Sequence, residues 1–158
     1  MNGYLWQVEV EMPFDHAMSK NRAWRHGNGR TWVDSTHAAF RDGLVTLVKV
    51  EVNRAGVTVV QNRLWLDIHV TKPSMRGDPV NVLDMACDAV KVAVGLDDCW
   101  FSVERLDWDI GPEPKLTVAI GQKSATAIAC CSTCGLRAAT EFNKGRSRCR
   151  DCEKRSRK

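Results

Sequence analysis

Five aspartates lie within the twenty-one residues from Asp78 to Asp98, a segment that also has the pattern of an amphipathic helix. At about 100° per residue, Asp84 and Asp88 share a polar face, where two carboxylates one turn apart repel each other. A divalent cation would compensate this repulsion, because carboxylate oxygens are common ligands of Mg²⁺ and Mn²⁺. The polar face consists of Asn81, Asp84, Asp88 and Lys91, and the apolar stripe beside it of Val80, Leu83, Cys87, Val90 and Val94.

Each of these acids also has a purely structural interpretation. Asp78 followed by Pro79 fits a helix N-cap with proline at the first helical position. Asp84 and Asp88 fit a solvated helix face, and the segment 95–98 fits a helix stop followed by a turn. A helix start and the turn after its end do not normally meet. We therefore expect the strand after Asp98 to return along the helix and to bring this acid near the helix face.

Charge is distributed unevenly along the 158 residues, whose net charge is +4. Residues 135–158 carry nine Lys or Arg against three Asp or Glu, whereas the rest of the chain carries 14 against 16. A nearly neutral domain with a basic tail predicts a polyanionic partner such as nucleic acid. The chain has no signal-peptide pattern and no apolar run approaching 18 residues, so we expect a cytoplasmic protein without membrane contact.

The C-terminal segment has the cysteine spacing of a structural zinc site. Two CxxC pairs are separated by fourteen residues, which predicts a Cys₄ zinc ribbon in residues 130–158, with Cys130 as an alternative first ligand. A disordered cysteine-rich tail is the alternative. The predicted zinc ligands are Cys131, Cys134, Cys149 and Cys152.

Hydrophobic periodicity predicts an α+β fold for residues 1–121, followed by a linker at 122–129. The expected order is β-α-β-α-β-β, a small mixed sheet with two helices on one face. The predicted strands are 4–12, 64–70, 100–110 and 115–120, and the predicted helices begin near residues 35 and 79.

Residues 14–34 are predicted to form a long loop that is rich in cations and aromatic residues. Such a mixture suits phosphate contacts and base stacking. The alternative is a surface loop whose Trp24 and Trp32 fold back onto the core. The cations of this loop are Lys20, Arg22, Arg25 and Arg30.

Two parts of the chain together resemble the RusA family of Holliday-junction resolvases. The first is the segment 19–33 with Phe40-Arg41-Asp42, and the second comprises Arg76-Gly-Asp78-Pro-Val80-Asn81, Asp88-Ala-Val and Leu96-Asp97-Asp98. The resemblance covers about residues 4 to 120. It implies a small α+β homodimer, in a bacterial or phage-infected cell, that makes paired nicks in branched DNA with Mg²⁺ or Mn²⁺ held by aspartates.

Carried over to this sequence, the family pattern assigns roles to four residues and departs at two positions. Asp78 falls on the first family aspartate, Asn81 on the asparagine that follows the second, and Asp88 and Asp98 on the later ones. Val80 stands where the family has its second aspartate, and Asp84 where it has a lysine.

From this pattern we expect Asp78, Asp84 and Asp98 to bind the metal, with Asp88 as a further ligand or a group that orients a metal-bound water. The expected activity is cleavage of Holliday junctions, flaps or forks. A branched-DNA-binding protein without catalysis and a zinc-module adaptor are the alternatives. The predicted DNA-binding residues are Lys20, Asn21, Arg22, Arg25, Arg30, Arg76, Lys91, Arg146, Arg148 and Arg150.

Overall fold

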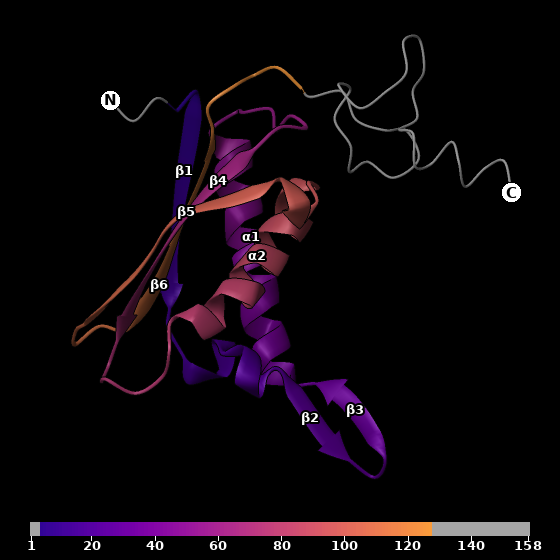
Figure 1. The fold of residues 1–158 in the computed structure, drawn as a ribbon, viewed down its shortest axis with the longest axis vertical. Helices are drawn as coiled ribbons and strands as arrows, with labels where there is room; N and C mark the ends of the chain where they lie inside the picture. Colours follow the sequence, from indigo (N-terminus) through magenta and orange to yellow (C-terminus); the bar gives the residue numbers. More distant parts are fainter. Residues whose placement is uncertain (1–3, 128–158) are drawn as a thin grey trace, which may run out of the picture.

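The computed structural model of the protein describes residues 4–127, which form an α+β fold with a four-stranded mixed sheet and two helices on one side of it (Figure 1). The strands lie in the order β1-β6-β4-β5, and only β4 and β5 are parallel. This confirms the predicted fold class and the order of the long elements. The strands are β1 (Trp6–Pro13), β4 (Leu64–Lys72), β5 (Phe101–Ile110) and β6 (Lys115–Gln122).

Strand β4 lies in the middle of the sheet and carries the core face that its alternating sequence predicts. Leu64, Leu66, Ile68 and Val70 are all fully buried. They pack in one cluster with residues of α1 (Ser35–Arg54) and α2 (Val80–Val94). The strand continues past the predicted end through Lys72, and this extension positions a buried cation near Asp78.

Helix α2 buries the predicted apolar stripe only in part. Val90 is fully buried, and Leu83, Cys87 and Val94 pack against the core, but Val80 is 49% exposed. The prediction for Val80 was wrong because α2 also buries residues outside that stripe, where it packs against α1 and the core. The predicted Leu83, Cys87 and Val94 are only half-buried. The buried residues are Val82, Met85, Ala86, Ala89 and Val90.

Residues 14–34 are more regular than the long loop predicted from the sequence. Two short turns, η1 (His16–Met18) and η2 (Lys20–Arg22), precede an antiparallel hairpin of β2 (Trp24–Gly27) and β3 (Arg30–Val33). Asn28 and Gly29 at its tip have φ values of 51° and 71°. An Asn-Gly pair favours this kind of two-residue turn, a signal that the prediction of a loop overlooked.

The hairpin projects from the body of the domain (Figure 1). Trp24 and Trp32 are 56% and 49% exposed. The alternative that these rings fold back onto the core is therefore wrong.

The last strand defines the end of the described domain. Gln122 is fully buried, and its side chain exchanges hydrogen bonds with the backbone of Val60. Strand β6 therefore continues through Gln122. The predicted zinc ribbon and Arg146, Arg148 and Arg150 lie outside the described residues. No helix within residues 4–127 is long and apolar enough to cross a membrane.

Candidate functional site

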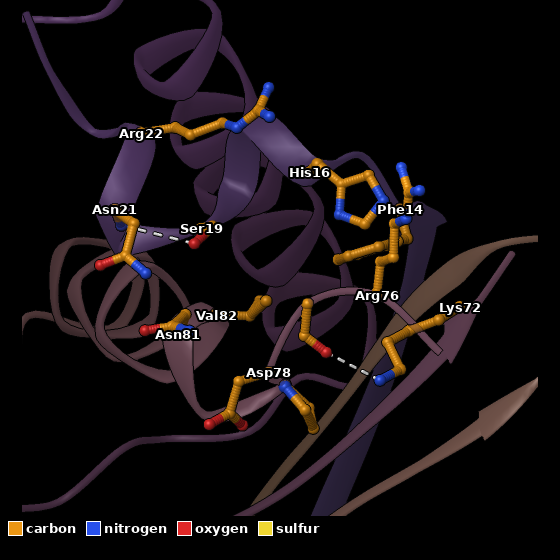
Figure 2. A pocket seen from close by; sticks show the side chains of 12 residues that line it. Phe14, His16, Ser19, Asn21, Arg22, Lys72, Arg76, Asp78, Asn81 and Val82 are labelled. Atoms are coloured by element: carbon orange, nitrogen blue, oxygen red, sulfur yellow. Dashed lines mark hydrogen bonds between the residues drawn. The ribbon is translucent and has the colours of Figure 1, made fainter. Parts of the chain in front are cut away.

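A cavity of about 430 Å³ lies where the end of β4, the start of α2 and the turns η1 and η2 meet (Figure 2). Four residues predicted from the sequence to bind DNA or metal, and Asn81 of the family pattern, line it together. They come from two segments more than fifty residues apart, which the fold brings side by side. These residues are Asn21, Arg22, Arg76, Asp78 and Asn81.

The loop between β4 and α2 carries Asp78 into this cavity. Oδ1 of Asp78 accepts a hydrogen bond from the backbone N–H of Val80 at 3.0 Å, next to the helix start, but the N-cap residue is Pro79 and not Asp78 as the structural interpretation predicted. The preceding Gly77 has φ +82°, and a Cβ there would lie 3.4 Å from the ring of His16. This tight, left-handed turn is what glycine permits.

Lys72 is a residue of the cavity that sequence reasoning missed. Lys72 is only 3% exposed, and its Nζ donates a hydrogen bond to the backbone oxygen of Gly77 at 2.8 Å. The same ammonium lies 3.9 Å from the ring centroid of Trp108. The predicted strand ended at Val70, so nothing in the sequence indicated that this lysine is buried.

The other predicted acids lie along α2 and beyond its end. Oδ2 of Asp84 is 2.9 Å from Nζ of Lys20, and both side chains are exposed. The charges of Asp84, Asp88 and Asp98 all act on the thiol of Cys87. Burial is the main reason that the pKa of Cys87 rises to about 11, and these three charges raise it further.

Lys91 links the last turn of α2 to the acidic pair that follows it. Its Nζ is 3.0 Å from Oδ2 of Asp97 and 3.4 Å from Oδ1 of Asp98. A backbone N–H from Cys99 and the Lys91 ammonium hold the pKa of the Asp97 carboxyl well below its usual range. These contacts, those with Asp97 above all, raise the pKa of Lys91. The expected approach of Asp98 to the helix therefore occurs only at the last turn.

Asp78 and Asp98 consequently lie at opposite ends of α2. The helix has 15 residues, which corresponds to a length of about 22 Å at 1.5 Å per residue. Within residues 4–127, no group of three or more His, Cys, Asp or Glu side chains is close enough to hold one ion. Within residues 4–127 of a single chain, the predicted metal ligands Asp78, Asp84 and Asp98 therefore do not come together.

The hairpin adds a second basic surface next to the cavity. Nε of Arg25 lies 2.6 Å from Oδ2 of Asp34, the residue that caps α1. Arg25 is the main reason that the pKa of Asp34 is below its usual range. Arg25 thus anchors the hairpin to the domain, whereas Arg30 near the tip is exposed to solvent.

Asp78 and Asn81 are the residues of the cavity that suit a hard divalent cation. Carboxylate and amide oxygens bind Mg²⁺, which commonly uses one or two carboxylates together with waters and substrate phosphates. One carboxylate and one amide fit this pattern as part of a site that a phosphate group completes.

No protein-family model matches the chain, and no curated protein matches it. The similarity to the RusA family therefore rests on the residues of the sequence alone.

Proposed function

We propose that the protein is a metal-dependent endonuclease that cuts branched DNA, such as Holliday junctions, flaps or forks. The observation that carries the proposal is the composition of the cavity beside Asp78. Asp78 and Asn81 offer oxygen ligands there, and Arg22, Lys72 and Arg76 offer positive charge to a phosphate. A cavity lined by one carboxylate and three cations suits a substrate that is itself an anion.

The chemistry divides between the metal and the side chains of the chain. Bound Mg²⁺ or Mn²⁺ would supply an activated water and neutralise charge that develops on the phosphate. Asp78 and Asn81 would hold the ion, while Arg22 and Arg76 would orient the DNA backbone. The exposed rings of Trp24 and Trp32 would stack on unpaired bases at a branch point.

A homodimer would bring together the acids that one chain keeps apart. Strand β5 is an edge strand, and its Val103, Trp108 and Ile110 are exposed. Antiparallel pairing of two β5 strands about a two-fold axis would place the start of one beside the end of the other. The end of β5 neighbours the end of β4, which leads to Asp78.

Asp98, just before β5, would then approach Asp78 of the partner subunit. Pairing centred on Leu106 also sets Arg105 opposite Asp107 of the partner subunit, an attractive cross-strand pair. The C-terminal residues, if they form the predicted zinc ribbon, would grip the DNA backbone with Arg146, Arg148 and Arg150.

One observation favours a second candidate, a branched-DNA-binding protein without catalysis. Val80 supplies no carboxylate, and Asp84 pairs with Lys20 instead of lining the cavity. A fluorescent four-way junction incubated with Mg²⁺ or Mn²⁺ distinguishes the possibilities. Metal-dependent cleavage that Asp78→Asn abolishes supports the endonuclease, binding without cleavage supports the second candidate, and neither result supports an adaptor.

A further inference from the structure

We propose that the cavity beside Asp78 is a phosphate-binding site in which the buried ammonium of Lys72 is the anchoring cation. The inference rests on the proposed function in taking the phosphate to be that of a DNA strand. It adds a residue that the sequence pattern did not assign and a role that does not require cleavage.

Lys72 brings a buried positive charge to the cavity. Lys72 is 3% exposed, yet it belongs to none of the ion pairs found within residues 4–127. An ammonium has three N–H donors, and the backbone oxygen of Gly77 accepts one of them. A buried cation without an anionic partner is unfavourable, so an anion that enters the cavity gains a strong interaction.

The surroundings of Lys72 in the cavity favour an anion with several acceptor oxygens. Arg22 and Arg76 line the same cavity and are exposed, so they can close over a ligand (Figure 2). Lys72, in contrast, is held by its place on β4 and by its contact with the ring of Trp108. Arginine suits the fork-like geometry of phosphate oxygens, and lysine acts as a point charge. The negative charge of Asp78 repels a ligand that carries a carboxylate. A divalent cation can, however, bridge Asp78 and a phosphate.

The alternative is a purely structural role, in which Lys72 only holds the loop of Asp78 in place through Gly77. A structural role predicts that neutralising Lys72 alters stability without changing how DNA binding depends on salt. A phosphate contact predicts the reverse, since each cation that neutralises a phosphate contributes to the salt dependence of binding. The salt dependence therefore separates the two roles.

The experiment compares Lys72→Met with Lys49→Met, the same change at an exposed position of α1. Junction binding is measured by fluorescence anisotropy without added divalent cation, over a range of salt concentrations. Lys72→Met is expected to weaken binding about tenfold or more, as for loss of a charged hydrogen bond. The slope of log K against log salt is negative, and Lys72→Met should reduce its magnitude by about 0.9. Lys49→Met should leave both near wild type.

Wild-type affinity and an unchanged slope in folded Lys72→Met would overturn the inference. A second measurement does not depend on the folding of that variant. Inorganic phosphate should raise the thermal midpoint of the wild type above that in chloride of equal ionic strength. The double variant Arg22→Ala with Arg76→Ala, both exposed positions, should lose this increase. No phosphate-specific increase in the wild type also overturns the inference.

Failure of the inference and failure of the proposed function give different results. Lost DNA binding in Lys72→Met, together with a wild type that cuts no junction, supports the phosphate site and rejects the nuclease. A wild type that cuts, with a Lys72→Met variant that binds and cuts equally well, rejects the phosphate site and retains the nuclease.

Discussion

The ammonium of Lys20 lies 2.9 Å from a carboxylate oxygen of Asp84, and this ion pair joins η2 to the middle of α2. In the RusA pattern the position of Asp84 carries a lysine, so here the cation comes from another segment. Both side chains are more than half exposed, and such a pair contributes little to stability. The pair is therefore of interest mainly for its charges next to the proposed DNA-binding surface.

The sequence predicts that Asp84 binds the metal in place of the carboxylate missing at Val80, whereas in the structure Asp84 pairs with Lys20 outside the cavity. Asp84→Ala should then shift cleavage to higher Mg²⁺ concentration, and Asp84→Lys should abolish it. The double change Val80→Asp with Asp84→Lys restores the family pattern and should recover part of the activity. Because Val80 is 49% exposed, a carboxylate there should cost little packing stability. Cleavage by Asp84→Ala with wild-type Mg²⁺ dependence would make Asp84 a bystander.

Asp78→Asn is predicted to abolish cleavage while preserving junction affinity. The loss of rate should be about 100-fold or more, since a metal stabilises the transition state by several kcal/mol. Affinity should be equal or higher, because one negative charge near the phosphates is removed. Cleavage rates and anisotropy are measured on the same junction. Glu113→Gln, the neutralisation of an exposed acid in the turn before β6, serves as the control.

The predicted zinc site gives a test that does not depend on the described domain. Purified, reduced protein should contain about one Zn²⁺ per chain. Replacing both Cys149 and Cys152 with Ser should release the metal and weaken DNA binding. Metal analysis by mass spectrometry measures the first effect and anisotropy the second. Intact protein without zinc would contradict the assignment of these cysteines.

The contacts of Asp97 predict a dependence of stability on pH. The folded-state pKa of Asp97 lies below its ordinary value, so its stabilising effect is present above about pH 4 and is lost as the pH falls further. The thermal midpoint of Asp97→Asn should therefore fall less than that of the wild type as the pH is lowered. It is measured between about pH 6 and about pH 2, the range in which carboxyl groups titrate. Identical acid profiles for Asp97→Asn and wild type would contradict this effect.

The strands and helices follow from local signals in the sequence, whereas the site depends on contacts that periodicity does not encode. The alternation around Leu66 predicts β4, and Gly95 with φ +69° ends α2 as its residue type indicates. The burial of Lys72 depends on its contacts with the loop of Gly77 and the ring of Trp108, and the exposure of Val80 on how α2 packs against α1. No hydrophobic pattern within one segment specifies that packing.

The separation of Asp78 and Asp98 by the length of α2 gives a final prediction, which concerns the dimer. If the partner subunit completes each site, Asp78→Asn and Asp98→Asn are each inactive as homodimers. In a mixed dimer, one site then lacks both acids while the other keeps Asp78 from one chain and Asp98 from its partner.

Mixing the two inactive variants, with subunit exchange verified by differently tagged chains, should therefore restore about half of the sites in each mixed dimer. The restored product should be a junction with a single nick, detected on a denaturing gel. Mixing Asp78→Asn with itself, under a different tag, is the matched control and should remain inactive. If each chain builds its site from its own acids, both sites of the mixed dimer lack one ligand and no activity returns. Wild-type protein that stays monomeric by light scattering, with and without junction DNA, would likewise reject the shared site.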